Sequence, residues 1–477
     1  MISGRSDLDL LSIKHEYNIH ERNFRRMAGS LRRSEGLGLW STIAFAVGTM
    51  IGAGVFVLSG LVISVAGPGA ILSYLICGFI IILSGLSYAS LASIFPEDGG
   101  GYLYAKRILG PFPGFLAGWG MYIFSVISSA FVLIGFGIYL DLLLGWTIDP
   151  RAFALVGLVL ITALNFRGLA EAGRAELIMV ASKVAILIGL VLFGLFSLKG
   201  SDLNGFLSSG SGGVVTGISM VFFAYTGFQV AAMMAGEVKE SSKKVPLAIM
   251  ASIGIVMFIY VGVIVALLSA NLPSYGSDSV FDAAKVLIGP IGGTIIAIAA
   301  IISALSSSNA NIIGASRITM EMAAEQQFPG RFAKLRNGQP INSILLGSFI
   351  TLFFILPGDL SFILDVTNVT ILFTMVLVNV SAIMLCVRGD LIPKDRAYFK
   401  VPLKWFLPAI GAISCVVMIV FLPITTIVLG AGAILAGSIL YIIEDTKEGK
   451  MAIKEIRRVL GREMSELSYE WKRNGRK

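Results

Sequence analysis

Long apolar runs, separated by short polar or charged stretches, dominate this chain of 477 residues. Read against proline, glycine and charge, the pattern gives twelve runs, most of them about 20 residues long, the length that an α-helix needs to cross a bilayer. The runs cover 38–65, 69–95, 112–144, 152–166, 176–198, 213–235, 246–271, 290–317, 343–357, 361–387, 405–422 and 424–443. The pattern therefore predicts an all-α polytopic membrane protein with twelve transmembrane helices.

Composition supports this prediction, because 56% of the residues are hydrophobic and only 14% are charged. A soluble protein carries roughly 25% charged residues, so this chain is too apolar for a large soluble domain. The three cysteines lie inside apolar runs without a CxxC pair, and both histidines, His15 and His20, precede the first run. These residues predict no disulfide framework and no metal site, and we expect no cofactor.

Lysine and arginine residues are distributed unevenly between alternate loops. With the N-terminus in the cytoplasm, 33 of the 37 fall on the cytoplasmic side and three, Arg151, Lys199 and Lys285, on the outer side. This bias follows the positive-inside rule and supports an even number of spans, with both termini on the cytoplasmic side of the plasma membrane. The N-terminal segment 1–37 and the basic tail 444–477 are therefore predicted to be cytoplasmic.

The tail contains a segment, 451–471, in which apolar residues recur at helical spacing. A nucleic-acid-binding role is a weak alternative for its basic residues. A helix lying on the anionic inner leaflet explains both the apolar stripe and the charge. We therefore expect the lipid bilayer, and no nucleic acid, as the partner of this tail.

The first apolar run contains a cluster of poor helix formers, "GTMIGAG" at 48–54. Glycine in a helix interior costs about 1 kcal/mol relative to alanine, and in lipid unwound backbone is tolerated only where protein or a cavity surrounds it. Two interpretations fit the cluster. Gly48 and Gly52 form a GxxxG pair, which is typical of a tight helix-packing site, or the helix breaks here and presents its peptide groups to a ligand.

A second interruption occurs in the sixth run, where "FFAYTGFQ" (222–229) places small and polar residues at mid-depth. Runs one and six would cross the membrane in opposite directions, as in inverted repeats whose discontinuous helices meet at the bilayer midplane. We therefore predict a transport core at 38–387, with repeat one at 38–198 and repeat two at 213–387, and two further helices at 405–443. The half-helix ends would offer N–H groups to an anion and carbonyls to a cation, which suits an α-amino acid.

Four motifs follow one another along the chain: "GTMIGAGVF", "PEDGGGYLYAKRILGPFPGFLAGW", "FFAYTGF" with "GEVKESSKKVPLAI", and "SSSNANIIGASRITMEMA". Together, over about residues 36–443, the chain resembles the amino acid–polyamine–organocation transporters. The resemblance implies two inverted five-helix repeats, with helices 1 and 6 discontinuous, and two additional C-terminal helices. The chain departs from the family pattern at "AEQQFP" (324–329), in place of a charged stretch, and at Gly236, where an acid is common. Both departures concern cytoplasmic gating rather than class.

By this resemblance, the substrate would bind at the two helix breaks. The N–H groups of Gly52, Ala53 and Gly54 would hold its carboxylate. Its ammonium would be received by carbonyl groups at the ends of the broken helices, those of Met50, Phe223, Ala224 and Thr226. The Phe223 ring would cover the site, although plain core packing is an alternative for this side chain.

Lys183 is the one basic residue well inside an apolar run, about 10 Å beyond its cytoplasmic end at a rise of about 1.5 Å per residue. A lysine at such depth costs about 2.5–3.5 kcal/mol on insertion scales. One interpretation is that the side chain snorkels to the interface. The other is that Lys183 carries a proton, because removal from water disfavours the charged ammonium and so helps the group to release its proton. In sodium-independent members of the family that the chain resembles, a lysine on span five fills the cation site between spans one, five and eight. The resemblance therefore implies Ser306 and Ser307 as neighbours, and transport coupled to protons rather than sodium.

The remaining polar residues inside the runs are weaker candidates. Asp365, near the outer end of the tenth run, is predicted to belong to an external gate or to be a simple helix-end acid. Asn309 and Asn311 are two positions apart and cannot share one helix face, so at most one is expected to point at the pathway.

Enzyme motifs such as HExxH and the P-loop are absent from the sequence, which favours a gradient-driven carrier over an enzyme or a primary pump. Two alternatives stay open: a carrier of polyamines or other organic cations, and a sensor that binds an amino acid without moving it. The predicted site contains no acidic side chain, which favours a zwitterion over a cation, although "FFAYTGF" resembles the branch of the family that carries cationic amino acids.

Overall fold

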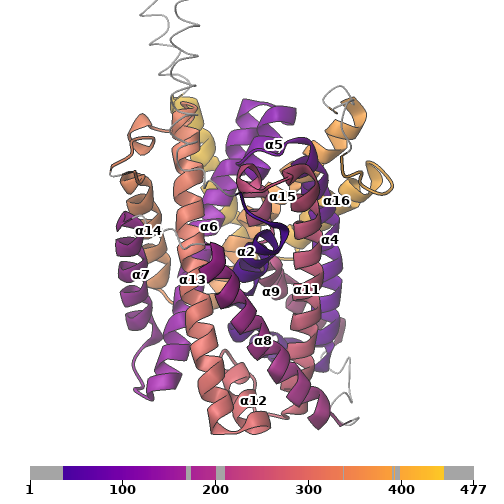
Figure 1. The fold of residues 1–477 in the computed structure, drawn as a ribbon, viewed down its shortest axis with the longest axis vertical. Helices are drawn as coiled ribbons and strands as arrows, with labels where there is room; N and C mark the ends of the chain where they lie inside the picture. The colour runs from indigo at the N-terminus through magenta and orange to yellow at the C-terminus, as the bar shows by residue number, and fades with distance from the viewer. Residues whose placement is uncertain are drawn as a thin grey trace, which may run out of the picture.

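The computed structural model describes residues 36–167, 173–199, 210–336, 338–388, 392 and 398–444. Within these ranges the regular structure is helical, apart from two isolated β-bridges. Most of the helices run along the long axis of the molecule (Figure 1). Nearly all of the predicted N-terminal segment and the predicted surface helix of the tail lie outside the described residues.

The helices, in chain order, are α2 (Leu39–Ile51), α3 (Gly54–Ala66), α4 (Ala70–Ile94), α5 (Gly100–Leu109), α6 (Pro111–Leu144), α7 (Pro150–Arg167), α8 (Gly173–Ser197), α9 (Gly210–Tyr225), α10 (Gln229–Met233), α11 (Ser241–Ser269), α12 (Ser279–Ile288), α13 (Pro290–Ala324), α14 (Ile341–Ile355), α15 (Leu360–Arg388) and α16 (Phe406–Val420). A last helix follows at Ile424–Glu444.

Nine helical stretches of the described chain are long and apolar enough to cross a membrane, and three shorter apolar helices accompany them, α2, α14 and α16. One of the nine, Gly54–Ile94, is a hairpin of α3 and α4 joined by a short 3₁₀ turn. The expectation of an all-α, multi-pass membrane protein is therefore confirmed. The last two apolar runs are also separate helices, because α16 ends at Val420 and the next helix begins at Ile424.

The largest difference in helix length is at α13, which continues to Ala324 where the apolar run ended at 317. The extension "ITMEMAA" consists largely of good helix formers, and Ile318 and Met322 are buried one turn apart. The single charge of Arg317 therefore does not end the helix. Residues 318–324, which follow the predicted span, are therefore helical rather than part of a loop.

Two short amphipathic helices lie outside the predicted spans. The glycine-rich segment at residues 99–101 leads into α5, in which two tyrosines, Tyr102 and Tyr104, are buried. In α12 the residues Val280, Ala283 and Ala284 are buried at helical spacing. Both helices are ten residues long, too short to register as a span, and they lie at opposite ends of the molecule (Figure 1).

The two longest helices, α6 and α13, pack against each other at the centre of the fold. Almost all of α6 is buried, whereas the last helix exposes an apolar surface that includes Ile424, Val428 and Leu435. An exposed apolar helix face of this kind is expected to contact lipid. The centre of the molecule is thus enclosed by helices rather than by loops.

Both predicted interruptions are present in the structure. Between α2 and α3 the backbone leaves the helix at Gly52, with φ of 38°, and between α9 and α10 it does so at Gly227, with φ of 124°. These positive φ values lie in a region that glycine adopts at little cost and residues with a side chain do not. The glycines therefore mark true breaks in the helices.

Candidate functional site

The two breaks lie directly against each other. A Cβ atom added to Gly227 would be 2.8 Å from the backbone nitrogen of Met50, and one added to Gly54 would be 3.3 Å from Cα of Ala224. Only glycine allows the two backbones to approach so closely. The packing interpretation and the helix-break interpretation of the glycine cluster are therefore not exclusive, because the glycines pack the two unwound segments together.

Lys183 lies at the end of α2, with only 3% of the residue exposed. Its Nζ donates to the carbonyl oxygen of Gly48 at 2.9 Å and lies 3.3 Å from Oγ of Ser303, which in turn donates to the carbonyl of Gly52 at 2.6 Å. The last carbonyls of a helix have no partner within the helix and carry its negative dipole end. The ammonium is therefore held where a cation is most favoured, inside the protein and not at the interface.

Ser303, one helical turn before Ser307, is thus a serine of α13 that contacts Lys183, and it adds to the expected positions Ser306 and Ser307. Ser307 lies at the break, with its Oγ 3.5 Å from the carbonyl of Thr49. The spacing of four residues between Ser303 and Ser307 on one helix face was the signal that could have identified the missing residue.

A second residue absent from the sequence expectations is Tyr260 of α11, which is fully buried. Its hydroxyl lies 2.7 Å from the carbonyl of Met50 and 3.0 Å from the carbonyl of Ala224. One hydroxyl has one proton, so the two carbonyls share it. Tyr260 consequently bridges the ends of α2 and α9. A lone tyrosine in an apolar run gives no signal of this role in the sequence.

A small cavity of about 20 Å³ lies beside the breaks. Its lining comes from the first break, the second break, α6 and α13. The lining residues are Thr49, Met50, Gly52, Ala53, Gly54, Phe124, Ser128, Val132, Phe223, Thr226, Gly227, Ser307 and Asn311. These described lining residues are all uncharged.

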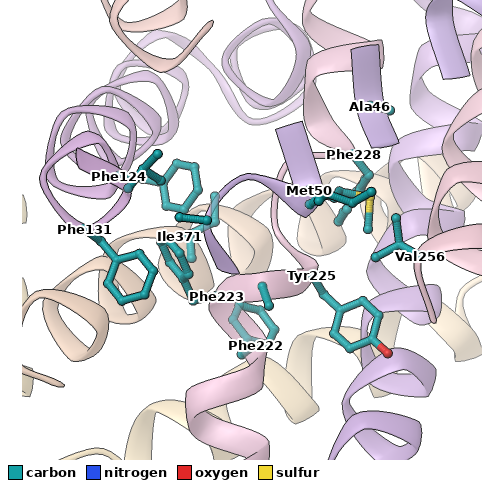
Figure 2. Packing of buried hydrophobic residues seen from close by; sticks show 14 of the residues in the cluster. Ala46, Met50, Phe124, Phe131, Phe222, Phe223, Tyr225, Phe228, Val256 and Ile371 are labelled. Carbon is teal, nitrogen blue, oxygen red and sulfur yellow. The ribbon is translucent and has the colours of Figure 1, made fainter. Parts of the chain in front are cut away.

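Aromatic side chains of α6 and α9 form one wall of this region. The ring of Phe223 packs edge-on against Phe131, with the ring centroids 4.7 Å apart, and Figure 2 shows both rings near Phe124 of α6. Phe223 is both a cavity-lining residue and part of the core. The two interpretations of this side chain therefore describe the same position.

The other expected site residues have different surroundings. Ala224 packs against Gly54 and is not among the residues that line the cavity. Asp365 is half-buried on α15 and does not line the cavity either. Of the two asparagines of α13, Asn311 lines the cavity. Asn309 instead accepts a hydrogen bond of 2.8 Å from Asn165 of α7. Asn311 therefore faces the cavity and Asn309 faces α7, so the two side chains lie on different faces of α13, as their spacing predicted.

Backbone contacts close the molecule at the end that carries α5. Leu37 pairs with the segment after α10 through two hydrogen bonds. The N–H of Leu37 donates to the carbonyl of Glu237 at 2.8 Å, and the N–H of Lys239 donates to the carbonyl of Leu37 at 3.0 Å. Arg317 of α13 adds an ion pair to Glu237 at 3.3 Å. The chain that precedes α2 is thus attached to the chain that follows α10.

Close contacts also exist at the opposite end. The hydroxyl of Tyr139 on α6 donates to the carbonyl of Phe56 on α3 at 2.7 Å. The segment before α12 approaches α3 so closely that a Cβ atom on Gly60 would be 2.0 Å from the carbonyl oxygen of Gly276. Contacts between the segments that flank the breaks are therefore present at both ends of the molecule.

The described residues contain no group of three or more His, Cys, Asp or Glu side chains that could hold a metal ion. The polar groups at the breaks are peptide groups, hydroxyls, an amide and one ammonium. Such a set can bind a small solute by hydrogen bonds and by the dipoles of helix ends.

Known proteins of similar sequence are transporters. The chain is 27% identical to the methylthioribose transporter of Bacillus subtilis, over 84% of this chain and 91% of the relative. It is 26% identical to the branched-chain amino acid permease BcaP of the same organism, over 88% and 95% of the two chains. It is also 28% identical to the serine/threonine exchanger SteT of that organism, over 61% and 69%.

The family model described as "Amino acid permease" matches residues 37–443, which span both helix breaks, Lys183 and all of the cavity. The relatives are aligned over most of their own length, so the similarity concerns the whole membrane-embedded chain. Family members and relatives are transporters rather than enzymes, in agreement with the interpretation of the sequence. The chain belongs to the amino acid permease family.

Proposed function

We propose that this protein is a secondary active transporter of neutral α-amino acids that works by alternating access. In this proposal the twelve apolar runs form two inverted five-helix repeats, 38–198 and 213–387, with two additional helices. The observation that supports it most strongly is the contact between two broken helices around a buried, uncharged cavity. Unwound backbone inside a membrane is expensive, so its presence twice at one place argues for a binding role.

The substrate carboxylate would be bound by the N–H groups at the start of α3, those of Gly52, Ala53 and Gly54. The N–H groups of Ala53 and Gly54 precede the first turn of α3, where N–H groups have no carbonyl one turn earlier and the dipole end is positive. The N–H of Gly52 donates to the carbonyl of Gly48 at 3.3 Å and would have to exchange this bond for one to the substrate. The ammonium would approach the carbonyl ends of α2 and α9, where Met50 and Thr226 line the cavity. Backbone groups would thus recognise the part that all α-amino acids share.

A conformation held together by contacts at both ends fits a transport cycle in which the substrate is enclosed midway. A water molecule needs about 10–15 Å³ of such space, so a cavity of about 20 Å³ admits roughly one water and no amino acid until side chains shift. Met50, Phe124 and Phe223 are the large side chains that line it. We infer that one end must open before the substrate can enter.

We propose that Lys183 couples this cycle to protons and makes sodium unnecessary. Its ammonium already occupies the negative end of α2, where a bound cation would otherwise compensate the carbonyls. Loss of its proton would remove the positive charge that the carbonyls at the end of α2 stabilise, and would weaken the charge-assisted bond between α8 and Gly48. Protonation on one side of the membrane and release on the other would then drive uptake.

The proposed orientation places both termini and the α5 end in the cytoplasm, in the plasma membrane. The excess of basic residues on that side supports it. Glu237 and Arg317 would then form part of the cytoplasmic closure, and Asp365 would lie toward the outer gate.

The relatives' names describe different substrates, including a sugar derivative, so the family does not fix what this chain carries. A polyamine would leave the N–H groups of α3 unused and would need acidic side chains, and the described cavity lining has none. This observation favours an amino acid over an organic cation.

The test is uptake of a labelled mixture of neutral amino acids by purified protein in liposomes, with a proton gradient imposed in sodium-free buffer. We expect accumulation above the external concentration, and loss of accumulation when the gradient is dissipated. Binding without uptake would identify a sensor, and uptake restricted to polyamines would identify the other alternative. Either outcome would contradict the proposal.

A further inference from the structure

We propose that Ser128 and Asn311 form a side-chain subsite that selects small amino acids carrying a hydroxyl group. This inference rests on the proposed function and adds to it the part of the substrate that the backbone groups do not recognise. Ser128 is on α6 and Asn311 on α13, the two helices that form the centre of the fold. Both side chains line the cavity and are nearly buried, with 4% and 7% exposed.

The two side chains are placed by helical spacing. On α6, Phe124, Ser128 and Val132 recur every four residues and so form one stripe along the cavity. On α13, Ser307 and Asn311 do the same from the opposite side. Ser128, in the middle of the α6 stripe, therefore contacts Asn311 of α13.

Nδ2 of Asn311 donates to Oγ of Ser128 at 3.2 Å. This bond uses one of the two amide hydrogens and one lone pair of the serine, so the serine proton and the amide oxygen still have hydrogen-bonding capacity. A hydroxyl on the substrate can donate and accept at once, and it can match both kinds of group. A methyl group in the same place would displace water from them without replacing its hydrogen bonds, which is costly in a buried site.

The remaining walls limit size and charge. Phe124 and Val132 flank Ser128 on α6, and Phe223 is held in place by its contact with Phe131. These apolar groups surround Ser128, so a side chain longer than that of threonine would have to displace them further than a hydroxyl and one methyl would. Because the described lining is uncharged, an ionised side chain would be buried without a counter-charge.

The experiment compares threonine with valine, which has the same shape but a methyl group in place of the hydroxyl. Uptake of each is measured in competition, in proteoliposomes, for the wild-type protein and for Asn311→Leu and Ser128→Ala. The wild type is expected to prefer threonine by at least about tenfold, and Asn311→Leu to reduce that ratio to near one. Ser128→Ala, which changes the volume least, is expected to lower the ratio as well.

Asn309→Leu is the matched control, because Asn309 is on the same helix but bonds to Asn165 outside the cavity. Its ratio should equal that of the wild type. A wild-type preference for valine, or an unchanged ratio in both subsite variants, would overturn the inference. Failure of the wild type to take up any amino acid, glycine included, would instead refute the proposed function, so the two failures are distinguishable.

Discussion

At the scale of single residues, the end of α2 is stabilised by side chains from three other helices. Lys183, Tyr260 and Ser303 each contact a different carbonyl there. A broken helix in a membrane protein must satisfy its free carbonyls, and an unsatisfied buried group costs about 1–3 kcal/mol. The polar residues around the break are therefore as much a part of the site as the residues that line its cavity.

Replacing Lys183 by alanine is expected to abolish proton-driven accumulation, because the proposed proton carrier is removed and Gly48 loses its charged donor, keeping only the bond from the N–H of Gly52. The measurement is uptake by proteoliposomes under an inward proton gradient. Lys285→Ala, at an exposed position on α12, is the matched control and should behave as the wild type. Full accumulation by the Lys183 variant would exclude the residue from coupling.

Tyr260→Phe is expected to lower stability by about 1–3 kcal/mol and to reduce uptake. The ring would keep its packing against Tyr225, at 5.3 Å between centroids, but both carbonyls would lose their shared donor. Thermal unfolding in detergent measures the stability. Tyr122→Phe is the control, because the buried Tyr122 hydroxyl has no hydrogen-bond partner among the described residues. If the two variants unfold at the same temperature, the Tyr260 bridge is not stabilising.

At the scale of helices, the break in α9–α10 depends on one glycine. Gly227→Ala is expected to destabilise the protein and impair transport, because its φ is 124° and a Cβ atom would be 2.8 Å from the backbone of Met50. Gly254→Ala in α11 is the control, since an added Cβ atom meets nothing within 4 Å there. That change should be neutral or stabilise by up to about 1 kcal/mol. The measurements are the thermal stability and the uptake activity of the two variants. If Gly227→Ala behaves like Gly254→Ala in both, the break does not depend on this glycine.

Much of the helical architecture could be predicted from the sequence, because lipid imposes a length and an apolar composition that few other environments require. The breaks could be predicted because the glycine cluster at 48–54, and the small and polar residues at 222–229, interrupt otherwise apolar runs. The helices α5 and α12 could not be predicted in this way, because each has ten amphipathic residues and a search for apolar runs of about 20 residues passes over them.

The prediction of the site was strongest for backbone groups and weakest for their partners. Glycine clusters identify where peptide groups are free, so the residues at both breaks could be named. Ser303 and Tyr260 act through contacts between helices that are distant in sequence. The only local signal for Ser303 is its four-residue spacing from Ser307, and a lone tyrosine in an apolar run gives none for Tyr260. Such residues become visible only when the packing of α8, α11 and α13 is known.

At the scale of the whole molecule, transport requires that the closed ends open in turn. The α5 end is closed by the Leu37 backbone pairing and by the Glu237–Arg317 ion pair. The ion pair is partly exposed, and such pairs contribute about 0.2–1 kcal/mol. Its loss should shift the balance between conformations by a few-fold rather than unfold the protein.

Arg317→Gln is therefore expected to increase cytoplasmic access to the cavity by about two- to fivefold. Access is measured as the rate at which an impermeant thiol reagent, applied from the cytoplasmic side, labels a cysteine introduced at Ser307. Exchanging the charges, with Glu237→Arg and Arg317→Glu combined, should restore the original rate. A labelling rate that does not respond to any of these variants would mean that the ion pair has no part in closure.

The central claim is that two broken helices bind a zwitterion through their peptide ends. An experimental structure with a bound neutral amino acid tests it most directly. We predict the carboxylate within hydrogen-bond distance of the N–H groups of Gly52–Gly54 and the ammonium near the carbonyl ends of α2 and α9. An amino acid bound elsewhere, or helices that run unbroken through these glycines, would contradict it.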